Sequence, residues 1–100
     1  RVVFVDYPPV VSVNEPPCPA LPLAPWQVAG TEAVGAQLAG ATARAAEASG
    51  ARLVSVARAG AGHTVCSAEP WIGGYGQSMA FHPNEAGKAA VADRVVDALR

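Results

Sequence analysis

Two short apolar runs separated by an alanine-rich segment constrain the fold of this chain more than any other feature. The run Val2–Val5 is continuous, β-branched and aromatic, which is typical of a strand buried on both faces. The predicted strand Arg1–Tyr7 ends where Pro8 can no longer donate a main-chain hydrogen bond. A second apolar run predicts another strand over Arg52–Ala57.

The segment between these strands predicts a crossover helix over Thr31–Ser49. Thr31 is a good N-cap, and Gly50 suits the position just after the last helical residue. The alternative is an earlier start near Trp26, with Gly30 inside the helix. Its expected apolar face consists of Val34, Leu38, Ala41, Ala45 and Ala48. Strand, helix and strand in this order indicate a parallel α/β sheet with a right-handed crossover.

A second amphipathic helix is predicted from the N-cap Asn84 to Leu99. Its expected apolar face is Ala92, Val95, Val96 and Leu99, with Lys88, Asp93, Arg94 and Asp97 largely elsewhere. Pro83 keeps His82 out of the helix, so His82 lies on a short stiff loop at the helix start. Such a loop suits catalysis, but an ordinary surface histidine has the same pattern.

Two long loops connect these elements. Val10–Gly30 is rich in proline and apolar, so we expect an ordered loop packed on the domain, without regular structure between Pro16 and Pro25. It is either a functional loop or a structural lid over the core. The second loop, residues 58–81, contains glycine-rich turns that lack the lysine and helix of a phosphate-binding loop.

Composition narrows the class of partner. The hydrophobic share of 51% and charged share of 15% suit one small packed domain. The net charge of −1 and the lack of a basic cluster argue against nucleic acid as a partner. No apolar run approaches the roughly 20 residues that a membrane span needs.

Two strands alone do not make a stable parallel sheet, because such sheets are covered on both faces and flanked by further strands. Arg1–Tyr7 would leave an open apolar edge. We therefore expect additional strands from residues before Arg1 or from a partner chain.

Cys18 and Cys66, one in each long loop, allow three interpretations. They form a disulfide that ties the loops together, they are two free buried thiols, or they bind zinc together with His63 and His82. The zinc spacing matches no standard ligand pattern.

Several short motifs point to one family. His82-Pro83-Asn84, followed by Ala86-Gly87, precedes the last helix. The strand ending in Tyr7-Pro8 lies upstream, and Gly62-His63, Cys66 and Pro70-Trp71 lie between them. In this order and spacing the motifs resemble the C-terminal half of the SGNH (GDSL-type) hydrolases, in particular the secreted bacterial branch.

The resemblance implies that residues 1–100 are the C-terminal half of a single domain with a flavodoxin-like, three-layer α/β/α fold. It implies a serine esterase or lipase in which His82 is the catalytic histidine. The nucleophilic serine and the oxyanion-hole residues would come from an N-terminal segment or partner chain, so this chain alone would not be a competent enzyme. The alternative is a non-catalytic binding or structural fragment.

The chain departs from the family pattern where many members have an aspartate three residues before the histidine. Met79 occupies that position. We predict that a main-chain carbonyl, that of Met79 or a neighbour, orients the His82 imidazole. Asp6 is a less favoured substitute because it ends a different strand. None of the serines has the context of a nucleophile.

The remaining expectations concern the cysteines, the pocket and His63. Secreted relatives carry a disulfide at corresponding loops, which favours a Cys18–Cys66 bond and a secreted or cell-envelope location. Tyr7, Trp71 and Tyr75 are candidate substrate-pocket residues, for a lipid, an acylated saccharide or a small ester. His63 is either a substrate contact or a loop residue bonded to main chain. We expect no cofactor and no metal.

Overall fold

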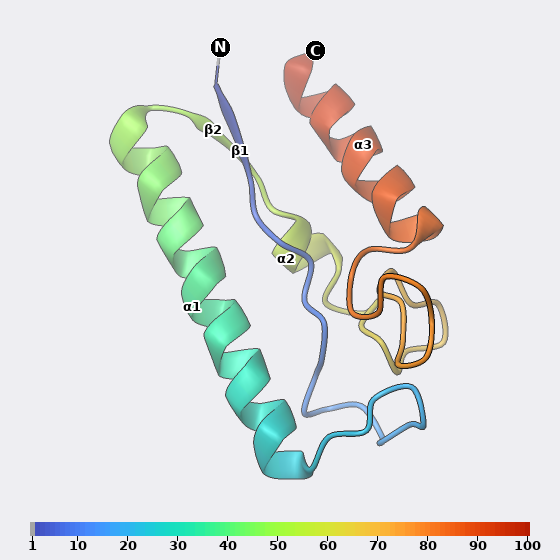
Figure 1. Ribbon diagram of the computed structural model, residues 1–100. Helices are drawn as coiled ribbons and strands as arrows, with labels where there is room; N and C mark the ends of the chain where they lie inside the picture. Colours follow the sequence, from blue (N-terminus) through green and yellow to red (C-terminus); the bar gives the residue numbers. More distant parts are fainter. Residues whose placement is uncertain (1) are drawn as a thin grey trace.

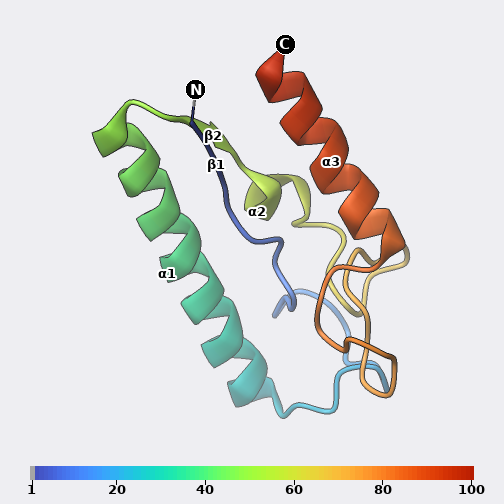
Figure 2. The ribbon, with the colours of Figure 1, turned by 45° about the horizontal axis from the view of Figure 1, so that its top comes forward.

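The computed structural model describes residues 2–100, and its centre is a parallel pair of short strands. β1 (Val3–Val5) and β2 (Arg52–Val54) pair with Val3 opposite Arg52 and Val5 opposite Val54. Figures 1 and 2 show helix α1 on one side of this pair and helix α3 on the other. The predicted α/β class and parallel pairing are therefore confirmed, and Arg1 of the predicted first strand lies outside the described residues.

Helix α1 spans Pro25–Ser49 and so takes the earlier of the two predicted starts. Proline at the first helical position needs no N–H partner, and the Gln27 side chain accepts the main-chain N–H of Ala24 at 2.8 Å. The helix ends at Gly50, which has a left-handed φ of 69°.

The predicted apolar face of α1 is wrong. Val34 and Leu38 are 65% and 55% exposed, whereas Ala46 is buried and Ala39 and Ala43 are half-buried. Alanines surround the helix on nearly all sides, so the apolar pattern does not select one face. The smallest side chains approach the sheet and the larger ones remain outside.

The second strand is shorter than predicted because Ser55 ends it. Ser55 is the N-cap of a short helix, α2 (Val56–Ala59), and its hydroxyl accepts the main-chain N–H of Arg58 at 3.3 Å. Serine is among the best N-cap residues, and this local preference prevails over the strand propensity of Val56.

Helix α3 spans Glu85–Leu99 and is capped by Asn84 as predicted. The Asn84 side chain accepts the N–H of Gly87 at 2.9 Å. The predicted apolar face is again displaced, because Val96 and Leu99 are about half exposed while Arg94 is half-buried. The Arg94 guanidinium lies over the Trp71 ring, 5.2 Å from its centroid, so a residue assigned to the polar side faces the protein.

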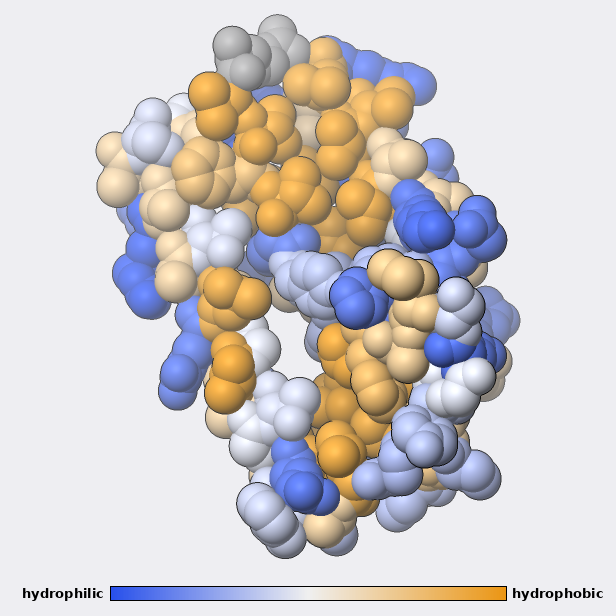
Figure 3. All heavy atoms as spheres, in the orientation of Figure 1, coloured by the Kyte–Doolittle hydropathy of each residue, from blue (hydrophilic) through white to orange (hydrophobic). Residues whose placement is uncertain are grey.

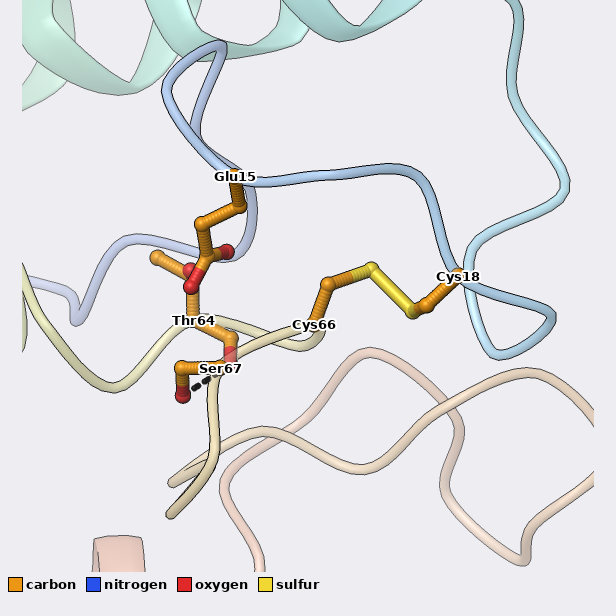
Figure 4. The surroundings of a disulfide bond; sticks show 5 residues. All are labelled: Glu15, Cys18, Thr64, Cys66 and Ser67. Atoms are coloured by element: carbon orange, nitrogen blue, oxygen red, sulfur yellow. Dashed lines mark hydrogen bonds between the residues drawn. A yellow bond between two sulfur atoms is a disulfide. The ribbon is translucent and has the colours of Figure 1, made fainter.

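The two long loops form a core of their own. Val11 and Leu21 from the first loop are buried with Val65 and Ile72 from the second. The disulfide between Cys18 and Cys66 joins the same loops, and the Glu15 carboxylate accepts a hydrogen bond from Thr64 beside it (Figure 4). The expectation of a packed first loop is confirmed as far as Ala24, and residues 25–30 of the predicted loop belong to α1 instead. The expected disulfide is confirmed.

An apolar surface lies over β1, between α1 and α3 (Figure 3). All three elements contribute exposed apolar side chains, and we refer to them as the apolar face: Val5, Val34, Leu38, Val96 and Leu99. No helix among residues 2–100 is long and apolar enough to cross a membrane.

Candidate active site

His82 lies on a segment that pairs with residues 70–73. Gly73 exchanges hydrogen bonds with it, donating to the His82 carbonyl at 2.9 Å and accepting from Phe81 at 2.8 Å. Ile72 and Pro83 form an antiparallel bridge beside them. The main chain of His82 is therefore fixed on both sides, as the Pro83-Asn84 pattern predicts for a stiff loop.

The His82 imidazole is oriented by the carbonyl of Ala80. Nδ1 lies 2.9 Å from that oxygen, and because a carbonyl only accepts, Nδ1 carries the proton. In neutral imidazole this leaves Nε2 as an acceptor, and none of residues 2–100 is hydrogen bonded to it. The His82 side chain is exposed to solvent.

Met79 was predicted to supply the carbonyl that orients the ring, but the next residue, Ala80, supplies it. The Met79 carbonyl accepts the main-chain N–H of His82 at 3.2 Å, which closes a tight turn and makes the next carbonyl, that of Ala80, reach the ring. The neighbour that the sequence left open is therefore the one in contact.

The turn around Ala80 has an unusual backbone. Met79 and Phe81 have positive φ values of 57° and 63°. Residues other than glycine seldom adopt such values. The Phe81 side chain packs against the loop core, whereas Met79 is 69% exposed. Strain of this kind persists only where the surroundings impose it, and it concentrates at functional sites.

Asn84 joins the start of α3 to the paired segment. Besides capping Gly87, its side-chain amide donates to the Pro70 carbonyl at 2.8 Å, and its main-chain N–H donates to the Trp71 carbonyl at 2.8 Å. The capping role was evident from the sequence. The two bonds to residues 70 and 71 depend on a long-range pairing that no local pattern indicates.

Asp6 is buried and fully engaged elsewhere. One carboxylate oxygen accepts the Ala57 N–H at 2.7 Å, and the other accepts the Ser55 hydroxyl at 2.9 Å. Asp6 thus fixes the end of β1 to the start of α2. The sequence analysis did not predict this role. Asp6 and Ser55 each follow one of two parallel strands, and the ends of such strands lie close together, so the contact could have been expected.

The three candidate pocket residues are not gathered in one cavity. Tyr7 lines a cavity of about 510 Å³ between the first loop and α1. The Trp71 ring stacks on the His63 ring, with centroids 4.2 Å apart, and Tyr75 is 66% exposed. A second cavity, of about 250 Å³, adjoins the first at Ser12 and reaches Leu21 and Cys66.

The remaining predicted groups have structural partners. His63 Nδ1 lies 2.8 Å from the Glu69 carbonyl, the main-chain contact that was one of its two interpretations. Both cysteines are in the disulfide, so they are not zinc ligands, and residues 2–100 contain no group of three metal-ligating side chains. No serine hydroxyl in residues 2–100 hydrogen bonds to His82.

The fold resembles two solved Streptomyces structures. An extracellular lipase from Streptomyces rimosus has a TM-score of 0.82 at 24% identity, over 98% of this chain and 42% of the lipase. Phospholipase A1 from Streptomyces albidoflavus NA297 has a TM-score of 0.82 at 23% identity, over 96% of this chain and 41% of the phospholipase. No family model and no curated protein matches the sequence.

The chain thus spans less than half the length of each of these enzymes. At such identities the likeness establishes the fold. It is the predicted α/β fold, which this chain shares with the lipase and the phospholipase.

Proposed function

We propose, with this shared fold as the premise, that the chain supplies the general base of an SGNH-type serine ester hydrolase. One observation carries the proposal: the His82 ring is held by the Ala80 carbonyl through Nδ1, with Nε2 directed to no protein partner among residues 2–100. This is the protonation pattern that a general base needs. A carbonyl takes the place of the acidic residue of a triad, because it also fixes the tautomer and the ring orientation.

The chemistry follows from that geometry. Nε2 accepts the proton of a serine hydroxyl as the serine oxygen attacks the ester carbonyl, and the resulting imidazolium gives the proton to the leaving alcohol. Water, activated by the same nitrogen, then releases the acid and restores the serine. The serine and the oxyanion donors belong to an N-terminal segment or a partner chain in this proposal.

The apolar face supports a partner segment. β1 pairs only with β2 among the described strands. The five side chains of the apolar face are between 40% and 65% exposed. A parallel strand with covering helices would pair with the open edge and bury those side chains.

The substrate is proposed to be an acyl ester, as a lipid, an acylated saccharide or a small ester. The names of the two similar enzymes, a lipase and a phospholipase A1, favour a lipid ester. The disulfide and the extracellular lipase favour a secreted or cell-envelope location.

The direct test is the hydrolysis of a short-chain ester by the complete protein. His82→Ala is expected to lower kcat/KM by about 10²–10⁴-fold, because general-base catalysis contributes that much. Met79→Ala is the matched control, since it keeps the main-chain carbonyl and removes an exposed side chain. Near wild-type activity in His82→Ala would contradict the role of His82. An absence of hydrolysis by the complete wild-type protein would favour the alternative, a non-catalytic binding or structural fragment.

A further inference from the structure

The main chain of Trp71 connects three parts of the structure around His82. Its N–H donates to the His63 carbonyl at 2.8 Å, and its carbonyl accepts the N–H of Asn84 at 2.8 Å. Asn84 comes two residues after His82 and caps α3. A shift of Trp71 would therefore move the segment that holds the catalytic histidine.

The first turn of α3 rests directly on Trp71. A Cβ atom at Gly87 would overlap the Trp71 carbonyl oxygen and would lie 3.1 Å from the Trp71 Cβ. Gly87 is buried, and only glycine permits this approach. The first turn of α3, which follows the cap at Asn84, is thus in direct contact with Trp71.

The indole in turn is held from two elements. Its ring is nearly parallel to the His63 ring, at 3° and 4.2 Å between centroids, and the Arg94 guanidinium from α3 lies 5.2 Å from its centroid. Trp71 lines neither cavity described above.

We infer that Trp71 is a positioning residue for His82 and acts through Asn84, instead of contacting the substrate. The inference rests on the proposed function of His82. The indole fixes the Trp71 carbonyl, that carbonyl fixes Asn84, and the His82 loop is held between Asn84 and Gly73. A small displacement at this site costs rate without weakening substrate binding.

The kinetic test separates positioning from binding. In the complete protein, Trp71→Ala is expected to lower kcat by about 10- to 100-fold with KM within about twofold, because misplacement by roughly 1 Å has effects of that size. Trp71→Phe keeps a stacking ring and should recover most of the loss. Trp26→Ala is the matched control, because Trp26 is 75% exposed, and it should leave both constants unchanged.

Amide exchange gives a readout that does not depend on activity. The Asn84 N–H should exchange faster in Trp71→Ala and remain protected in Trp26→Ala. Gly87→Ala is a second variant in case Trp71→Ala does not fold, and it should also lower kcat and expose the Asn84 N–H. Its control is Gly35→Ala, where a helical Cβ would meet nothing within 4 Å.

Three results would overturn the inference. A raised KM with unchanged kcat would make Trp71 a substrate-pocket residue, and unchanged kinetics would leave it no role. Full protection of Asn84 in both test variants would break the proposed link. If His82→Ala retains activity, the proposed function fails, while exchange at Asn84 still decides whether Trp71 holds the loop.

Discussion

At the scale of single residues, histidine and aspartate have separate tasks in this chain. His82 is exposed, with one ring nitrogen held by main chain. Asp6 is buried, and both its oxygens accept hydrogen bonds from the start of α2. The first arrangement suits proton transfer and the second suits structural anchoring, so substitutions at the two positions should have opposite consequences.

Asp6→Asn is expected to lower the free energy of unfolding by about 1–3 kcal/mol, because the amide group replaces one acceptor with a donor that faces the Ala57 N–H or the Ser55 hydroxyl. Its kcat/KM at a temperature where it is folded should stay within a few-fold of wild type. Denaturant unfolding and ester hydrolysis measure the two effects. A loss of activity as large as that of His82→Ala would instead make Asp6 the acid of a displaced triad.

At the scale of elements, local signals predicted where the helices begin and end better than which way they face. The N-cap Asn84 correctly predicted the start of α3. For α1, the alternative start near Trp26 is one residue from the observed start at Pro25. The buried faces of α1 and α3 were each misassigned. They depend on which neighbour the helix meets, such as Trp71 for Arg94, and the pairing of residues 70–73 with His82 is equally non-local.

The disulfide gives an element-scale prediction. Cys18 and Cys66 are 48 residues apart, and closing a loop of that size contributes about 4 kcal/mol on the chain-entropy model. The double variant Cys18→Ser with Cys66→Ser should lose a large part of that stability in thermal or denaturant unfolding. Reduction of the wild-type protein is the control, and it should have a similar effect. A midpoint unchanged by both treatments would show that loop packing alone holds the two segments.

At the scale of the whole molecule, the apolar face is the feature that the two-strand sheet leaves unexplained. The strand count and the open edge were predictable from the sequence. The exposed side chains around the edge belong to the predicted apolar faces of α1 and α3, which the two strands do not cover. Val34 and Leu38 of α1 are exposed, as are Val96 and Leu99 of α3. Their exposure favours a further segment packed against β1.

Residues 1–100 expressed alone should therefore show weak amide protection in β1 and α1. Protection should rise when the proposed N-terminal segment is present, because the open strand edge would then be paired. Hydrogen exchange followed by mass spectrometry measures both states. Broad protection in the isolated chain would contradict the prediction.

Leu38→Glu locates the packing surface. Leu38 is 55% exposed here, so the change should matter little in residues 1–100 alone. In the complete protein it should cost about 2 kcal/mol or more, because a charge would be buried without a partner. Gln37→Glu, an exposed neighbour, is the matched control. Equal effects of Leu38→Glu in both forms would place the partner segment elsewhere.

The length of α1 has a consequence for which insertions and deletions the fold tolerates. The helix has 25 residues, or about 37 Å, and the longest dimension of the molecule is 41 Å. Figure 1 shows the chain after β1 running alongside α1 toward the start of that helix. The helix acts as a spacer between β2 and the disulfide-linked loops. Removing two turns would draw Pro25 about 10 Å toward β2, while Leu21 stays in the loop core. Length changes should therefore be confined to exposed loop positions, since a shorter α1 would pull the first loop away from its anchor.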